Sequence, residues 1–131
     1  MPGTKGQKEI KKTEASRRSP CPVACALDIL GDRWTLLIIR DLYLGRSRFR
    51  DFANSPEGIP TNILSERLER LLAHEIIAQI PASDGSKRLA YSLTPKGHAL
   101  LPILKAIRDW GLVWVKKTGV LLKTTEVKPE K

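Results

Sequence analysis

The segment from residue 55 to residue 93 constrains the fold more than any other part of the sequence, because it joins a turn, an amphipathic helix and two strand-like runs in a fixed order. The run Ser55-Pro56-Glu57-Gly58-Ile59-Pro60 indicates a turn by its proline and glycine content. A helix is predicted from Thr61 to His74, with apolar residues on one side and polar residues on the other. One face of this helix therefore packs and the other is available for contacts.

Two short apolar runs after this helix, Ile76–Ile80 and Leu89–Leu93, predict an antiparallel hairpin. The segment between them is polar, contains a glycine and ends in the cations Lys87 and Arg88. The sequence thus predicts a helix with an exposed polar face, followed by a hairpin with a basic tip.

The elements upstream are predicted from proline and glycine positions. Pro22 suits the first turn of a helix, and the helical pattern that follows is interrupted at Gly31-Asp32 before a second helix that runs to Leu44. Gly45 is placed as a C-terminal glycine. A short third helix is expected over 47–54.

A long helix is predicted after the hairpin, beginning at Thr94-Pro95 and ending near Lys117, with bends at Pro102 and Gly111. Its apolar residues spread around more of the circumference than so small a domain can cover, so we expect a second subunit to cover them. The residues expected at this dimer interface are Ile103, Leu104, Ile107, Trp110 and Trp114.

This order of elements predicts a mainly α fold with a small β-hairpin (α+β), namely a winged helix-turn-helix with a long C-terminal dimerisation helix. In such a module a helix enters the major groove of DNA, and the hairpin lies along the backbone and brings cations to phosphates. We therefore expect double-stranded DNA as the partner. A twofold dimer would bind a pseudo-palindromic site.

Composition supports one small domain between two basic ends. The chain has 131 residues and a formal charge of +9, with 41% apolar residues. Residues 1–19 carry six basic and two acidic side chains, which predicts a disordered basic arm, and residues 119–131 are expected to form a tail. The domain is expected over 20–118. The chain shows neither a membrane-spanning run nor a secretory signal, so we expect a cytoplasmic protein.

Several runs in this order resemble the HxlR-type bacterial transcriptional regulators, over roughly residues 20–118. The runs that carry the resemblance are Cys21-Pro22-Val23, residues 27–40, Gly45-Arg46-Ser47-Arg48-Phe49, Gly58-Ile59-Pro60, residues 64–68 and residues 91–97. The resemblance implies a homodimeric DNA-binding regulator of the bacterial cytoplasm, with dimer contacts from the N-terminal and C-terminal helices. It also implies that some members sense oxidants or electrophiles through the cysteine matched by Cys21, whereas Cys25 departs from the family's pattern.

The candidate DNA-binding residues fall into three groups. Side chains on the 61–74 helix are candidates for groove contacts. Side chains at the hairpin tip are candidates for phosphate contacts. Side chains at the start of the short helix are also candidates for phosphate contacts, because a helix start offers free N–H groups. The candidates are Thr61, Asn62, Ser65 and Arg70; Lys87 and Arg88; and Arg46, Ser47 and Arg48. Glu66 and Glu69 on the same surface repel phosphate.

Cys21 is a candidate redox or electrophile sensor, because a helix start and the nearby Arg17 and Arg18 lower the pKa of a thiol. The alternative for Cys21 is a small apolar residue at a helix end, and Cys25 is expected to be packed. A small-molecule effector is the other form of control that we consider.

Other functional classes find less support. Cys21, Cys25, His74 and His98 form no tight ligand array, so no metal site and no cofactor are expected. We find no phosphate-binding loop or nucleophile motif, so we do not expect an enzyme. The main alternative is a winged-helix protein-interaction module that does not bind DNA specifically.

Overall fold

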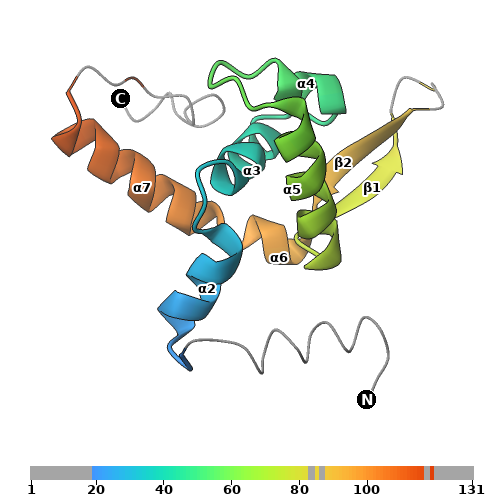
Figure 1. The fold of residues 1–131 in the computed structure, drawn as a ribbon. Coiled ribbons are helices and arrows are strands. Elements are labelled where there is room, and N and C mark those ends of the chain that lie inside the picture. Colours follow the sequence, from blue (N-terminus) through green and yellow to red (C-terminus); the bar gives the residue numbers. More distant parts are fainter. Residues whose placement is uncertain (1–18, 83–84, 86–87, 117–118, 120–131) are drawn as a thin grey trace. The chain divides into compact units, whose positions relative to one another are not determined.

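A computed structural model of the chain describes residues 19–82, 85, 88–116 and 119 (Figure 1). The expected arm and tail lie outside the described residues apart from Ser19 and Gly119, and so does Lys87. The chain divides into two compact units, residues 1–32 and 33–131. Among the described helices, none is long and apolar enough to cross a membrane.

The first unit contains helix α2, which spans Pro22–Leu30. Cys21 is its N-cap residue, with an extended backbone, and Pro22 opens the first turn. Because the first-turn N–H groups of a helix have no partner within the helix, proline fits there without losing a hydrogen bond. The predicted helix start is confirmed.

The second unit begins with three helices: α3 over Thr35–Tyr43, α4 over Phe49–Ala53 and α5 over Thr61–Ala73. Gly45 follows α3 with a φ of 99°, and its N–H donates to the carbonyl of Leu42 at 3.1 Å. This left-handed position after a helix favours glycine, so the predicted C-terminal glycine is confirmed.

Helix α4 is shorter than the predicted range of 47–54, because Arg48 is an N-cap residue with an extended backbone and Asn54 is the C-cap residue. Arg48 has φ −103° and ψ 155°, and the carbonyl of Ser47 accepts a hydrogen bond from the N–H of Tyr91 at 2.8 Å. This bond ties the start of α4 to the hairpin.

The hairpin consists of β1 over Ile77–Pro81 and β2 over Leu89–Leu93, paired antiparallel with Ile77 opposite Leu93 and Pro81 opposite Leu89. Pro81 stands at the outer end of its strand, where the N–H that it lacks costs least. Figure 1 shows the hairpin beside α5.

The predicted long C-terminal helix is wrong as a single element: it is two helices, α6 over Pro95–His98 and α7 over Leu101–Trp114. Pro102 cannot donate to the carbonyl four residues earlier, and its ring would clash with that carbonyl. The helix is therefore interrupted at Ala99-Leu100, and Pro102 lies in the first turn of α7. Gly111 lies inside α7 without ending it.

The core of the second unit is built from one face of each helix and the base of the hairpin. Phe52 of α4 is 1% exposed and lies against the ring of Tyr91 in β2, with ring centroids 6.1 Å apart. The other buried apolar side chains include Ile38, Ile39, Leu64, Leu68, Leu71, Ile76, Ile77 and Ala90. The fold is thus mainly α with a small β-hairpin, as predicted.

Candidate nucleic-acid interface

Helix α5 presents a polar face to solvent. Its buried side holds Leu64, Leu68 and Leu71, whereas Thr61, Asn62 and Ser65 are exposed and Arg70 is half-buried. The residue before the helix is Pro60, which offers no side-chain cap to the first-turn N–H groups, and no acidic residue lies in that turn. The N-terminal end of α5 therefore carries the positive partial charge that attracts an anion.

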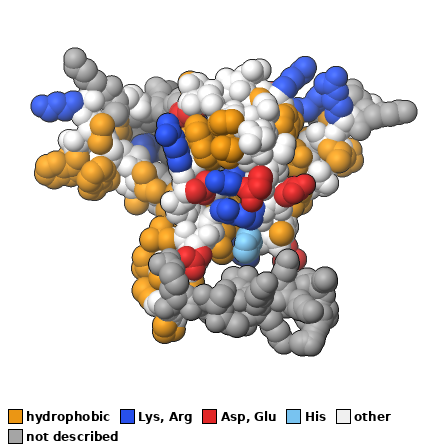
Figure 2. Space-filling model, viewed as in Figure 1, with side chains coloured by type: hydrophobic (Ala, Val, Ile, Leu, Met, Phe, Trp, Pro, Cys, Tyr) orange, Lys and Arg blue, Asp and Glu red, His pale blue; other side chains and the backbone are white. Residues whose placement is uncertain are grey.

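The acidic residues on this helix lie among basic ones. Figure 2 shows acidic and basic side chains next to each other over α5. Arg67 donates a hydrogen bond to Glu66 on the same helix. Glu66 is therefore partly neutralised, which reduces the repulsion that its charge exerts on phosphate.

Two backbone donors just before α4 are already bonded within the chain. The N–H groups of Ser47 and Arg48 both donate to Oδ2 of Asp51, at 3.1 and 2.9 Å. Partial burial raises the pKa of Asp51, but these two N–H groups and the nearby arginines outweigh burial and lower it below its ordinary value. The expectation of free N–H groups is therefore wrong for Ser47 and Arg48, because both groups are bonded to Asp51. Phosphate contact by the side chains of Ser47 and Arg48 stays a prediction.

Arg46 lies close to these residues and is half-buried. Its Nη1 forms an ion pair with Oδ1 of the buried Asp41 at 3.1 Å. Arg46 therefore has an intramolecular role that the sequence did not reveal.

The hairpin is anchored to the helices at its base. The bond from Tyr91 to Ser47 and the packing of Tyr91 on Phe52 fix β2 beside α4. Arg88 precedes β2 and is exposed. Of the two cations predicted at the hairpin tip, Arg88 lies within the described residues.

The end of α5 is held by the segment after the hairpin. Thr94 accepts a hydrogen bond from the N–H of Gly97, which confirms it as an N-cap, and its hydroxyl lies 2.7 Å from the carbonyl oxygen of Glu75. Lys96 Nζ donates to the carbonyl of His74 at 2.7 Å. A Cβ atom at Gly97 would lie 2.3 Å from the carbonyl oxygen of Ile76, so only glycine permits this approach.

Cys21 is exposed at the start of α2. The backbone N–H groups of Ala24 and Val23 lower the pKa of its thiol. Cys25 is half-buried, and its thiol donates to the carbonyl of Ser19 at 3.4 Å. Cys21 therefore has the more reactive environment of the two.

An apolar stripe runs along α7. Trp110 and Trp114 are 62% and 70% exposed, and Ile103 and Ile107 are exposed on the same side. Leu104 differs, because it is buried within its own chain and so is not available to a partner. In the first unit, Val23 and Leu27 are exposed one helical turn apart on α2. Orange patches in Figure 2 mark such apolar side chains.

Within the described residues, no three His, Cys, Asp or Glu side chains are grouped so as to hold a metal ion.

Comparison with known proteins gives one family. The family model described as HxlR-like helix-turn-helix matches residues 29–119. YvaP of Bacillus subtilis, an uncharacterised HTH-type transcriptional regulator, is 37% identical over 90 residues, which cover 69% of this chain and 83% of YvaP.

Solved structures give the same result. The structure of PA1607, a candidate transcription factor, superposes with a TM-score of 0.72 at 41% identity, covering 81% of this chain and 75% of PA1607. The reduced form of the transcriptional regulator YodB from B. subtilis superposes with a TM-score of 0.61 at 29% identity, covering 77% of this chain and all of YodB. YodB is also known in quinone-bound and diamide-treated forms.

Proposed function

Because the chain belongs to the HxlR-like helix-turn-helix family of transcriptional regulators, we propose that it regulates transcription as a homodimer bound to a pseudo-palindromic operator. The observation that carries this proposal is the exposed polar face of α5, which follows a capped short helix and precedes an anchored hairpin. A helix of this kind fits the major groove. The protein would act in the bacterial cytoplasm, where the chromosome is located.

The residues of the surface have different roles in this proposal. Thr61, Asn62 and Ser65 reach base edges, and the amide of Asn62 suits bidentate pairing with adenine. Arg70 on the same helix is proposed as a further groove contact. Arg88 contacts phosphate, and so adds affinity that does not depend on sequence. Lys87, Arg46, Ser47 and Arg48 are proposed as further phosphate contacts.

Selection of bound fragments from genomic DNA tests this function and yields the operator. Asn62→Ala should change the preferred DNA sequence. Arg88→Ala should weaken binding to the operator and to a scrambled duplex alike. It should also reduce the slope of log affinity against log salt concentration by about one, the value for one phosphate contact. If the unmodified chain binds operator and scrambled duplex equally, specific regulation is rejected and the protein-interaction alternative gains support.

The homodimer is proposed from the stripe of Ile103, Ile107, Trp110 and Trp114, since a monomer would leave these side chains in water. A twofold axis would place two α5 helices about 34 Å apart, one turn of DNA. Sedimentation at micromolar concentration should give a dimer, and Ile107→Glu should give a monomer. Leu112→Glu is the matched control, because Leu112 is exposed on the other side of α7. Equal sedimentation of Ile107→Glu and the unmodified chain would contradict this interface.

We also propose that oxidants or electrophiles act through Cys21. Support comes from its exposure and lowered pKa, and from the relative YodB, which has quinone-bound and diamide-treated forms. Diamide or quinone should change the DNA affinity of the unmodified chain and of Cys25→Ser, but not of Cys21→Ser. A Cys21→Ser protein that responds like its parent would exclude this role.

A further inference from the structure

A largely buried ion-pair network joins helix α3 to the turn that precedes helix α5. Arg40 in α3 is 7% exposed, and its Nη1 and Nη2 donate to Oε2 and Oε1 of Glu57, both at 2.8 Å. The same guanidinium donates to Oδ1 of Asp41 from Nε at 3.1 Å and from Nη2 at 2.8 Å. Two parallel bonds between a guanidinium and a carboxylate fix both groups in orientation as well as in distance.

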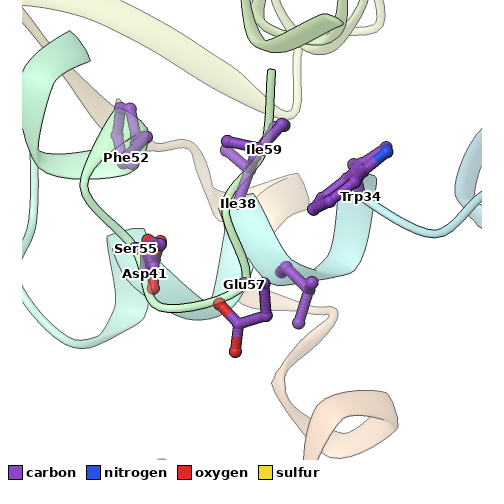
Figure 3. A pocket seen from close by; sticks show the side chains of 8 residues that line it. Trp34, Ile38, Asp41, Phe52, Ser55, Glu57 and Ile59 are labelled. Carbon is purple, nitrogen blue, oxygen red and sulfur yellow. The ribbon is translucent and has the colours of Figure 1, made fainter. Parts of the chain in front are cut away.

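Asp41 joins this pair to two further segments. It is 2% exposed and accepts hydrogen bonds from Arg46, after α3, and from Ser55, in the turn after α4. Figure 3 shows Asp41 next to Ser55, with Glu57 further along the same turn. The small pocket in this view is also lined by Trp34, Leu37, Ile38, Phe52 and Ile59.

The turn that receives these bonds leads into α5 over a short distance. Glu57 is followed by Gly58, whose φ is 71°, by Ile59, which is 7% exposed, and by Pro60, the N-cap residue. The chain therefore enters α5 with a polar anchor at Glu57 and an apolar anchor at Ile59. The first exposed residue of the helix, Thr61, comes directly after them.

Stability alone does not explain such a network. A buried ion pair contributes little net stability compared with apolar residues of the same volume, because removing two charges from water is costly. The Glu57 side chain is moreover 32% exposed, at the edge of the core. Hydrogen bonding to Arg40 lowers the pKa of Glu57, so the pair stays ionised at neutral pH.

We propose that Arg40 and Glu57 are positioning residues of the DNA-binding surface: their ion pair fixes the turn before α5 and so holds Thr61 and Asn62 in place for base contacts. Side chains that read a sequence must be held to within about 0.5 Å by their supports. The DNA part of this inference rests on the proposed function.

Glu57→Gln tests the inference, because it keeps the size of the side chain and removes its charge. Asp109→Asn is the matched control: it makes the same change in net charge on α7, where Asp109 is exposed and paired with its neighbour Arg108. For each protein we would measure affinity for the operator duplex and a scrambled duplex, thermal stability, and amide hydrogen exchange in peptides that cover residues 54–64.

Glu57→Gln should bind the operator about tenfold more weakly than the control does, which is the effect of losing one base contact. Its affinity for the scrambled duplex should equal that of the control. Exchange over 54–64 should rise and exchange in α3 should not. Glu57→Asp, which keeps the charge on a shorter side chain, should retain more of the operator affinity.

Two results would overturn the inference: unchanged exchange over 54–64 in Glu57→Gln, or raised exchange with operator affinity equal to the control's. An equal loss on operator and scrambled duplex would also contradict it, because positioning acts on sequence readout. A failure of the unmodified chain to prefer its operator would instead reject the proposed function, and the exchange measurement would still decide whether Glu57 fixes the turn.

Discussion

Replacing Glu75 by glycine should stabilise the folded chain. Glu75 is the first residue after the C-cap of α5 and has a φ of 60°, the only positive value among the described non-glycine residues. Its N–H donates to the carbonyl of Leu72 at 3.0 Å, and the N–H of Ile76 donates to that of Leu71 at 2.9 Å. These two bonds are those of a helix end that normally carries glycine at this position.

The size of the effect follows from two opposing terms. A left-handed backbone costs an L-residue about 1–2 kcal/mol, which glycine avoids. Glycine also increases the conformational entropy of the unfolded chain, which costs about 0.4–1 kcal/mol. Since the Glu75 side chain is exposed, its removal sacrifices little burial. The net gain is about 0.5–1 kcal/mol, or a rise in Tm of about 2–6 °C for a domain of this size.

Thermal unfolding followed by circular dichroism measures this change. Gly45→Ala is the matched control, because Gly45 occupies the same position after α3 with a φ of 99° and should lose about 1 kcal/mol on substitution. A Tm for Glu75→Gly equal to or below that of the unmodified chain would refute the strain argument, and so would a Gly45→Ala protein of unchanged stability.

Three further predictions concern residues that support the proposed DNA-binding surface. Gly97→Ala should lower stability by about 1–3 kcal/mol, measured by urea unfolding, because its Cβ would meet the carbonyl oxygen of Ile76; a neutral result would show that α6 can shift freely. Asp51→Asn should cost about 1 kcal/mol at pH 7, because the carboxylate caps Arg48. The pKa of Asp51 in the folded chain lies below its ordinary value of 3.8, so the stability that its carboxylate contributes is present above about pH 3.8 and is lost as pH falls through the folded pKa. The urea midpoints of Asp51→Asn and of the unmodified chain should therefore converge in acid. A difference that stays constant with pH would contradict the capping role of Asp51. Arg40→Met should destabilise by about 3–5 kcal/mol, because it leaves a buried carboxylate without its main partner, and a smaller loss in urea unfolding would indicate that water enters the site.

The sequence alone determined the order of the elements as far as the hairpin, and the two faces of α5. Helical periodicity, Pro22 at a helix start and Gly45 at a helix end are local signals, because they depend on residues within one or two turns of each other. For the same reason the polar face that carries Asn62 could be identified before any contact was known.

Only the tertiary structure decided how these elements are held. In the sequence, Arg40 and Asp41 mark only the end of an apolar run, yet both are buried. Glu57, seventeen residues after Arg40, folds back onto the guanidinium of Arg40, and Ser55 bonds to Asp41. Leu104 belongs to the core of its own chain although the helical pattern placed it with the exposed residues of α7. Asp51 takes up the N–H groups that the sequence assigned to phosphate. Each of these outcomes depends on which side chains a particular packing brings together, and periodicity along the chain carries no information about that.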